Sequence, residues 1–488
     1  MKLPSRKDLL FVIPVLCVYI ILTIISANHC YFWDNIQQIS KEAHWYYLTD
    51  FKHLLMPDQN SGAEITGTGY HPPLMGLMTA LLWKVFGYNL WVSHVFVFFW
   101  LLILIYNVWK LISRVIPEKF VGWVLLISLL EPTVLSQFST ASPDFILFTA
   151  FILSVRALLE QKQILLSIGI FFICCINMRG IFVGAILFIT NCYYSYIQAN
   201  SRFNIRSFLK IIVPYLPTLL LLIGYFTYYF IVKGWFFKNS TSTDHYSIPT
   251  SFGRIIKHFA EFGLRSVENG RILIWTIGIY TTYIFVKSKT PIHQNLKVLV
   301  LFFLLLTGLY ILFIFITQMP FSARYFMPQF FLLTLLTLSG IIQIFEKKRI
   351  WRIFVLVLIF EISGNFWIYP ERIAKSWDCT LAHLSYYELR NECFNYIDQQ
   401  KLDYKEISGG FCLYGNRRFI EMNGEDKDIG TDVNSKYFIY SNISNVEDSF
   451  ADSLKNPKLW IPIKSFKRGF VYIIIYKNKL PEKKNSIK

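Results

Sequence analysis

The sequence predicts a mainly α-helical, polytopic transmembrane bundle of about eleven spans, followed by a small α/β domain on the extracytoplasmic side. The 488 residues are 54% hydrophobic with a mean hydropathy of +0.42, which is more apolar surface than one soluble core of this length buries. Long apolar runs fill residues 1–370, and short clusters of Lys and Arg separate them. Residues 371–488 have the mixed composition of a soluble chain, so we expect two domains that meet near residue 370.

Each span requires about 20 apolar residues to cross the hydrocarbon layer. The first apolar run follows Lys2, Arg6 and Lys7, and its length and the lack of a small-x-small cleavage site favour a retained helix over a signal peptide. The predicted spans are 9–27, 90–110, 120–137, 143–160, 164–178, 181–198, 208–232, 271–287, 297–317, 325–345 and 350–369.

The basic residues predict the orientation. If the N-terminus is cytoplasmic, every inner loop carries Lys or Arg, as the positive-inside rule expects, and an odd number of spans places the C-terminal domain outside. Two outer loops, 28–89 and 233–270, are then long. Within them, Pro72–Gly87 and Ser251–Gly263 are expected to lie on the outer membrane face, because a further crossing would invert every later loop.

The C-terminal region reads as a helix at Tyr386–Gln400 and strands at Lys436–Ser441 and Gly469–Lys477. A Cys379–Cys393 disulfide would fit an oxidising compartment, although spacing does not establish the pairing. The net charge of +17 does not indicate a nucleic-acid partner, because the basic residues lie between apolar runs and the lipid bilayer accounts for them.

Polar residues recur where the predicted helices meet the outer face. Asp34 follows the first span, Tyr70 and His71 open the first surface helix, and Asp144 opens the span at 143–160. Each has a structural alternative: either Asp can cap a helix, and His71 can be an interfacial residue beside a helix-starting proline. Boundary carboxylates are nevertheless frequent at functional sites.

Two arginines stand on the same face, where the positive-inside rule disfavours them. Arg179 occupies a very short outer loop, and Arg324 precedes Tyr325 at the start of a late span. Arginines can snorkel to lipid phosphates, but they can also hold a phosphate or pyrophosphate bidentately. Together with a carboxylate that accepts a proton from an attacking hydroxyl, they suit a reaction on a lipid-linked anion.

In order and topology these residues resemble the GT-C superfamily of integral membrane glycosyltransferases, specifically the family-39-like group of aminoarabinose transferases and protein O-mannosyltransferases. The resemblance covers about residues 1–345. Many relatives carry an acidic pair where this chain has Asp34-Asn35, so a second carboxylate would have to come from Glu42, Asp50 or Asp144. The motifs that carry the resemblance are Phe32-Trp33-Asp34, His71 to Leu74, Asp144, Arg179-Gly180 and Arg324 to Pro328.

The resemblance implies transfer of a sugar from a polyprenyl-phosphate donor to a lipid, glycan or protein acceptor on the non-cytoplasmic face, with inversion. It implies that Asp34 is the general base and that Asp144, the second catalytic residue, positions Arg179 or the acceptor. Arg179 and Arg324, with Tyr325, would bind the donor phosphate, and Tyr70 and His71 would line the sugar or acceptor pocket. We assign no metal ligands, because Asn35 leaves few carboxylates for a hard oxygen site, but a divalent cation stays open.

Two other function classes share several of these features. A lipid-linked glycan polymerase or ligase would use an outer arginine on a long loop, for which Arg254 and Arg265 qualify. A lipid-saccharide transporter would bury charges in mid-helix and repeat its halves, and the clearest such charge is Glu361. The clustering of Asp and Arg at the membrane face argues against a receptor whose C-terminal domain alone binds.

Overall fold

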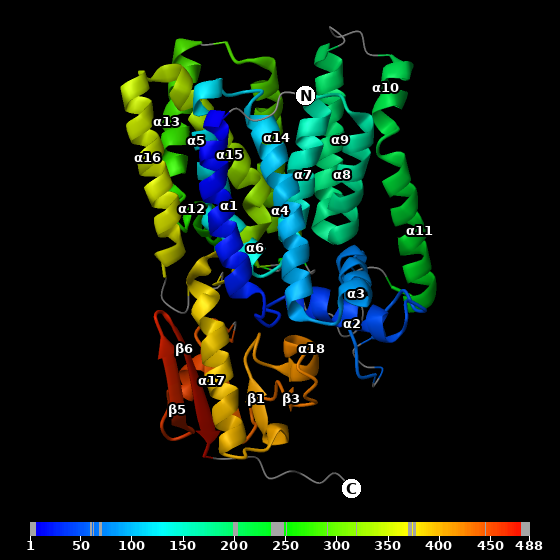
Figure 1. Cartoon of the computed structure of the whole chain (residues 1–488), viewed down its shortest axis with the longest axis vertical. Helices are drawn as coiled ribbons and strands as arrows, with labels where there is room; N and C mark the ends of the chain where they lie inside the picture. The colour runs from blue at the N-terminus through cyan, green and yellow to red at the C-terminus, as the bar shows by residue number, and fades with distance from the viewer. Residues whose placement is uncertain are drawn as a thin grey trace.

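The computed structural model describes residues 6–58, 61, 63–67, 71–198, 204–235, 248–249, 251–289, 291–318, 320–368, 373, 377–444 and 446–479. Most helices run side by side in a tall bundle, and the N-terminus and the C-terminal region lie at opposite ends (Figure 1). The bundle contains α1 (Arg6–Ser26), α4 (Leu90–Ile112), α5 (Glu118–Leu129), α6 (Pro132–Ser139), α7 (Pro143–Leu159), α8 (Gln163–Ile176), α9 (Met178–Gln198), α10 (Ile205–Ile212), α11 (Leu216–Lys233), α13 (Ile272–Ser288), α14 (Gln294–Ile316), α15 (Met327–Ile344) and α16 (Lys347–Ser363).

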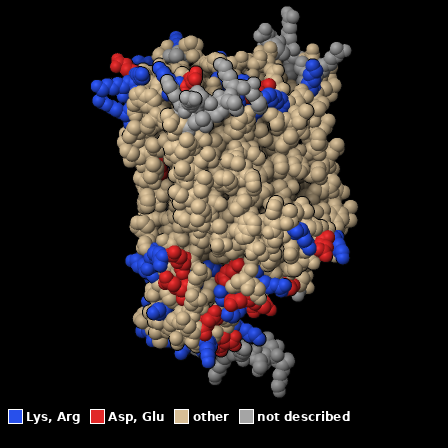
Figure 2. Space-filling view, viewed as in Figure 1, with Lys and Arg blue, Asp and Glu red and all other residues tan. Residues whose placement is uncertain are grey.

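An almost uncharged band crosses the face of the bundle that Figure 2 shows. Lys, Arg, Asp and Glu gather at the two ends of the molecule, and the surface between them carries almost none (Figure 2). Large apolar side chains such as Ile24, Phe99 and Ile231 are exposed. Such a surface is stable only against lipid, so the chain is a multi-pass membrane protein.

A helix occupies each predicted span, with α10 and α11 together covering 208–232. Five helices of the described chain are long and apolar enough to cross a membrane, or six if a bent pair counts as one span. The number eleven therefore stays a prediction. The bent pair corrects one expectation: the span predicted at 120–137 breaks between α5 and α6 with an angle of 57°. Pro132 starts the second helix, and the Glu131 carboxylate caps it through the Val134 N–H at 2.9 Å.

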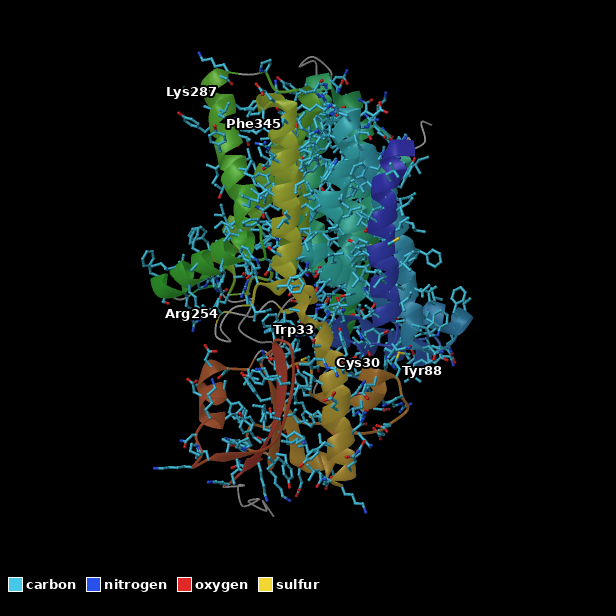
Figure 3. The ribbon with its side chains drawn as sticks, turned by 60° about the vertical axis from the view of Figure 1, so that its left-hand side comes forward. Cys30, Trp33, Tyr88, Arg254, Lys287 and Phe345 are labelled. Carbon is cyan, nitrogen blue, oxygen red and sulfur yellow. The ribbon has the colours of Figure 1, made fainter. Side chains whose placement is uncertain are left out.

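Short helices, among them the two predicted surface segments, lie at the end of the bundle that carries the C-terminal region, and their position on the outer membrane face stays a prediction. They are η1 (Ile36–Ser40), α2 (Lys41–Leu48), α3 (Leu74–Phe86), α12 (Phe252–Val267) and the 3-10 turns η3 (Ala323–Phe326) and η4 (Gly364–Phe366). Figure 3 shows α12, marked by Arg254, lying across the end of the bundle rather than along it. Helix α2 was not expected from the sequence.

The C-terminal region is α/β, as predicted, and the expected helix and strands are α17, β4 and β6. Its four-stranded sheet has the order β1-β4-β6-β5, with β1 parallel to β4 and the other pairs antiparallel. The predicted domain boundary at Tyr369-Pro370 lies outside the described residues. The elements are η5 (Trp377–Cys379), η6 (Leu381–Leu384), α17 (Ser385–Gln399), η7 (Tyr404–Glu406), β1 (Ile407–Gly409), β2 (Gly415–Asn416), α18 (Arg417–Glu421), β3 (Asp428–Ile429), β4 (Tyr437–Ser441), α19 (Asp448–Leu454), β5 (Trp460–Arg468) and β6 (Val471–Asn478).

The C-terminal region packs directly on one end of the bundle, the end that is predicted to face outside. The Tyr31 N–H donates to the Ile420 carbonyl at 3.1 Å, and the Ser136 hydroxyl donates to the Asp378 carbonyl at 2.6 Å. One apolar core runs without a break from the bundle into this region. The region therefore forms a fixed wall over the helix ends where the polar residues gather.

Candidate functional site

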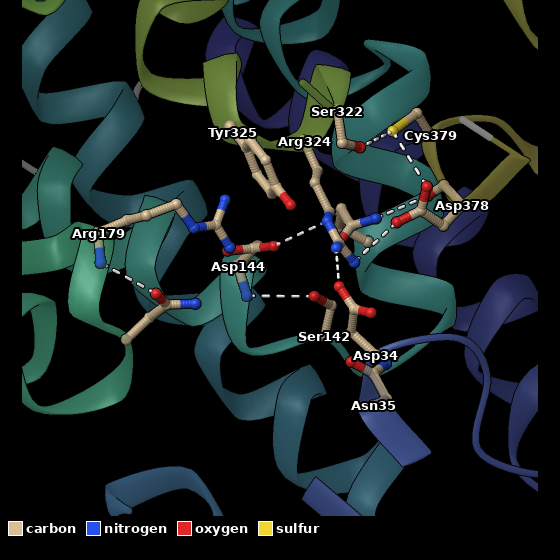
Figure 4. Close-up of polar contacts among 12 residues, drawn as sticks. Asp34, Asn35, Ser142, Asp144, Arg179, Ser322, Arg324, Tyr325, Asp378 and Cys379 are labelled. Atoms are coloured by element: carbon tan, nitrogen blue, oxygen red, sulfur yellow. Dashed lines mark hydrogen bonds and ion pairs between the residues drawn. The ribbon is translucent and has the colours of Figure 1, made fainter. Parts of the chain in front are cut away.

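Four of the predicted site residues meet at the helix ends that face the C-terminal region. Asp34 lies in the turn after α1, Asp144 in the first turn of α7, Arg179 in the first turn of α9 and Arg324 in η3 (Figure 4). They come from segments up to 290 residues apart. Arg179 was expected in a loop, but only Asn177 separates α8 from α9, so its backbone is helical.

Arg324 is the centre of the cluster. Its guanidinium forms an ion pair with Asp34, a second with Asp378 at 2.9 Å and a third, looser one with Asp144 at 3.4 Å. The Arg324 residue is only 6% exposed. A buried guanidinium that faces three carboxylates is fixed in position, and its donors point where an anion would be held.

Arg179 forms the second half of the cluster. Its Nη2 lies 2.8 Å from the Asp144 carboxylate, and its guanidinium lies 3.6 Å from the centre of the Tyr325 ring. Asp144 thus joins the two arginines, and Tyr325 orients one of them by a cation–π contact. Tyr325 thus lies against Arg179, and its substrate-binding role stays a prediction.

Gly180 allows α9 to begin close to the end of α8, and this brings Arg179 to the cluster around Arg324. A Cβ on Gly180 would overlap the carbonyl of Ile173, which lies in the last turns of α8. Only glycine lets α9 start this close to the end of α8. The Arg179-Gly180 pair therefore combines the charged group with the residue that permits the tight helix connection.

The structure excludes the capping alternative for the side chains of both carboxylates. At α7 the Ser142 hydroxyl accepts from the Asp144 N–H at 3.1 Å, so Ser142 is the cap and the Asp144 side chain pairs with the arginines. After α1 the helical turns begin at Ile36, and the Asp34 side chain points to Arg324. Neither carboxylate is needed to satisfy a helix end.

Asn35, where the resemblance to known glycosyltransferases led us to expect a second acid, has a structural role here. Its side chain is 3% exposed and donates to the Thr140 carbonyl at 2.8 Å. This bond ties the turn after α1 to the connection between α6 and α7. A carboxylate at this position would face a carbonyl oxygen without a donor between them, so the amide fits the contact.

The charge state of Asp34 follows from its neighbours. Burial raises the pKa of the Asp34 carboxyl, but Arg324, and more weakly Arg179, lower it further than burial raises it. The net pKa lies below the ordinary value, so Asp34 is ionised at neutral pH. Its side chain is still 34% exposed, which leaves room for an acceptor to approach.

His71 lies beside the cluster and is neutral. Burial, and then the charge of Arg179, lower the pKa of His71 to about 3. The Met178 N–H points to His71 Nδ1 at 3.4 Å, and the Tyr225 hydroxyl donates to the His71 carbonyl at 3.0 Å. A neutral imidazole can line a sugar pocket without competing for a phosphate. Tyr70, the other residue predicted for this pocket, lies outside the described residues.

An apolar cavity of about 350 Å³ opens next to His71. It lies between α3, α8 and α11, and Tyr225, which binds the His71 carbonyl, forms part of its wall. Its lining includes Pro72, Leu77, Phe171, Leu222 and Tyr228. A much smaller cavity of about 20 Å³, room for one water, separates Arg179 from Arg324 beside Asp144.

Asp378 is the site residue that the sequence did not indicate. It belongs to η5 of the C-terminal region, is 2% exposed, and pairs with Arg324. Its neighbour Cys379 was considered for a disulfide with Cys393, but both thiols are free, and Cys379 Sγ lies 3.4 Å from the Ser322 hydroxyl. No local pattern marks Asp378, because its significance comes from a contact with a residue 54 positions away.

A second buried ionic cluster lies near the break between α5 and α6. Arg271 pairs with Glu131 and donates to the Glu268 carbonyl at 3.1 Å, and Arg265 pairs with Glu268 at 2.7 Å. Glu361, noted in the sequence as a possible transport charge, is 2% exposed and interacts with this group. These contacts join α12, α13 and α16 to the broken helix pair.

The carboxylates do not assemble a metal site. Across the described part of the chain, His, Cys, Asp and Glu form no group of three or more that could hold a metal ion. The Arg324 guanidinium occupies the space between Asp34, Asp144 and Asp378 that a shared cation would need.

No protein-family model and no curated protein sequence matches this chain. Solved structures do. The chain superposes on ArnT from Cupriavidus metallidurans bound to undecaprenyl phosphate with a TM-score of 0.53 and 11% identity, over 95% of this chain and 97% of that one. The apo form of the same protein gives 0.51. The chain therefore has a GT-C-like fold, which it shares with ArnT.

A weaker likeness is to the archaeal oligosaccharyltransferase AglB from Archaeoglobus fulgidus, at a TM-score of 0.44 and 11% identity, over 88% of this chain and 69% of that one. This value is too low to support an argument. The GT-C-like fold agrees with the resemblance in the sequence, and coverage of nearly the whole ArnT chain means that the likeness includes the C-terminal region.

Proposed function

We propose that this protein is a membrane glycosyltransferase that moves a sugar from a polyprenyl-phosphate donor to a hydroxyl of a lipid, glycan or protein acceptor. The observation that carries the proposal is the cluster of Arg179 and Arg324, held by carboxylates at the outer end of the bundle beside a cavity for an apolar chain. An anionic headgroup on a long prenyl chain has the chemistry to occupy both. The likeness to ArnT, whose structure holds undecaprenyl phosphate, supports the same class of donor.

The two arginines would bind the donor phosphate. Guanidinium groups hold phosphate oxygens through paired N–H donors, and burial strengthens each bond. The cavity of about 20 Å³ between Arg179 and Arg324 is too small for a phosphate, so the cluster has to open by small side-chain movements. The prenyl chain would lie in the apolar cavity bounded by Pro72 and Tyr225, which is continuous with the lipid-facing helices α8 and α11.

Asp34 would be the general base. The acceptor oxygen attacks the anomeric carbon from the face opposite the phosphate, its proton passes to Asp34, and the bond between the anomeric carbon and the phosphate oxygen breaks. Polyprenyl phosphate leaves, and the configuration inverts. Arg324 holds the pKa of Asp34 low in the resting site. When the phosphate shares Arg324, that pKa rises, so donor binding makes Asp34 a better base.

The other predicted site residues have roles in the same scheme. Asp144 positions Arg179, Tyr325 supports the Arg179 guanidinium, and the neutral His71, with Tyr70, would line the sugar or acceptor pocket. The basic inner loops favour a cytoplasmic N-terminus and a C-terminal domain, residues 371–488, outside the plasma or inner membrane. The reaction would then take place on the non-cytoplasmic face.

The arginines that could favour a ligase or polymerase already bind other side chains of this chain. Arg265 is buried against Glu268, and Arg254 donates to Gln318 on the exposed side of α12. The charge that could favour a transporter, Glu361, is buried beside Glu131 and Arg271. None of these side chains faces the cluster around Arg324, so the glycosyltransferase is the function that the geometry supports best.

The test is release of polyprenyl phosphate from a panel of polyprenyl-phosphate sugars by the purified chain in nanodiscs. Wild type would be compared with Asp34→Asn and with Asp50→Asn, which alters an exposed carboxylate that pairs with Lys84 at 2.5 Å. Loss of a general base lowers the rate by about 10²- to 10⁴-fold, and the control should keep wild-type activity. Full activity in folded Asp34→Asn would refute the base, and turnover of pyrophosphate-linked donors alone would favour a ligase or polymerase.

A further inference from the structure

Asp378 presents an electrostatic problem for the proposed reaction. Among the residues that the structure describes, Asp34, Asp144 and Asp378 pair with two guanidinium groups, those of Arg179 and Arg324. Three carboxylates against two cations leave one negative charge uncompensated in a buried site. A donor phosphate adds further negative charge, so one carboxylate has to move away or become neutral before the phosphate can bind.

Of the three carboxylates, Asp378 is the one whose ion pair with Arg324 can be broken with the least effect on the proposed reaction. Asp144 keeps the ion pair with Arg179 at 2.8 Å when Arg324 turns to another partner. Asp34 is partly exposed, so water can stabilise its charge. Asp378 is fully buried, and among the contacts described its cationic partner is Arg324 alone. Its other side-chain contact is the weakly polar Cys379 Sγ at 3.5 Å.

The backbone of Asp378 is anchored independently of its side chain. Its carbonyl accepts from the Ser136 hydroxyl and from Gln137 Nε2, both at 2.6 Å. These bonds fix η5 against α6, so loss of the pair with Arg324 leaves the segment in place. The carboxyl group can therefore exchange its partner without unfolding the connection to the C-terminal region.

We propose that Asp378 is the resting-state counter-ion of Arg324, which the donor phosphate displaces and which takes up a proton as it is displaced. This inference rests on the proposed function and assigns the C-terminal region a part in it. Asp378 is a positioning residue: it holds Arg324 in place for the phosphate and prevents a buried cation from standing unpaired between turnovers. The proton comes from solvent and returns there when polyprenyl phosphate leaves.

The groups around Asp378 agree with protonation. Burial raises the pKa of the Asp378 carboxyl above its ordinary value, and Arg324 opposes this only in part. Burial also lowers the pKa of His383, which contacts the same Ser136 hydroxyl, to about 4, so it supplies no positive charge at neutral pH. The charged and titratable groups that face Asp378 are Arg324 from η3, Asp34 from the turn after α1, Asp144 from α7, Glu268 from the end of α12 and Cys379 from its own segment.

The test is calorimetric titration of the full chain with undecaprenyl phosphate in buffers of different ionisation enthalpy, which counts the protons taken up on binding. Wild type should take up close to one proton more than Asp378→Asn, since the ionisation of the phosphate itself is common to both. Asp378→Asn should bind about ten-fold more tightly, the lower end of what one charge-assisted hydrogen bond contributes. The ratio of the two affinities should fall toward one as the pH falls and Asp378 becomes protonated in wild type.

Two further variants separate charge from structure. Asp378→Glu keeps the carboxylate and should retain the wild-type proton count. Ser136→Ala removes a bond to the Asp378 backbone and leaves its charge, so it should leave the affinity unchanged. Equal proton counts in wild type and Asp378→Asn, or a gain in affinity for Ser136→Ala as large as that for Asp378→Asn, would overturn the inference. Failure of wild type to bind undecaprenyl phosphate, while it also fails to bind inorganic phosphate, would instead refute the proposed function.

Discussion

Arg324→Met should destabilise the protein in a way that depends on pH. The substitution keeps an unbranched chain of similar length but removes the cation that Asp34 and Asp378 share. Removal of one partner of a buried ion pair costs about 3–5 kcal/mol, because the other charge stays behind in a medium of low dielectric constant. The pair with Asp34 contributes least, since that carboxylate is 34% exposed and water screens it.

We therefore expect a loss of about 3 kcal/mol at neutral pH, the lower end of the range for a buried pair. Asp34 has a pKa below its ordinary value, so its contribution is present above the unfolded pKa of about 4 and disappears as the pH falls through the folded value. In Arg324→Met burial is unopposed, and both carboxylates become protonated at higher pH. The difference between wild type and variant should therefore be largest near neutrality and shrink in acid.

The assay is thermal unfolding in nanodiscs, followed by tryptophan fluorescence from about pH 8 to about pH 5. A loss of this size lowers the apparent Tm by roughly 3–6 °C in a chain of this length. Arg254→Met is the matched control, because Arg254 lies exposed on α12 and surface changes stay within about 0.5 kcal/mol. An unchanged Tm for Arg324→Met, or a loss that is the same at both pH values, would refute the electrostatic reasoning.

Three further predictions concern the neighbours of Arg324. Arg179→Lys keeps the positive charge but loses the planar contact with Tyr325. In steady-state kinetics, KM for the donor should therefore rise about ten-fold, with a smaller change in kcat. A large fall in kcat with an unchanged KM would contradict a binding role for Arg179. Gly180→Ala should cost about 1–3 kcal/mol, because the added methyl meets the Ile173 carbonyl, while Gly224→Ala on α11, where the space is open, serves as the control. Burial raises the pKa of Cys379 well above its ordinary value, so maleimide labelling of this thiol should require unfolding. Because the thiol is free, a reductant should not change the Tm. Fast labelling of the native chain would show that η5 opens.

The helices could be predicted because the signal for them is local. A run of about 20 apolar residues can be recognised from one stretch of sequence alone. A basic loop likewise indicates its side of the membrane, and no knowledge of the packing between helices is needed. The same holds for the surface helix α3 and for strand β6, whose residue types suit their environments. The break at Pro132 was missed because the apolar run continues across it, and the cost of breaking the helix is met by the Glu131 cap and its partner Arg271.

The order of Asp34, Asp144, Arg179 and Arg324 along the chain was sufficient to nominate a site through the resemblance to known glycosyltransferases. The sequence by itself determined which residues stand at the outer ends of helices, since each lies beside its own apolar run. Only the tertiary structure decided which carboxylates pair with the same guanidinium group. It also decided that Asn35 bonds the turn after α1 to the connection between α6 and α7, and that Asp378 of the C-terminal region pairs with Arg324. The physical reason is that an ion pair depends on the distance between side chains brought together by packing, and neither composition nor periodicity records that distance.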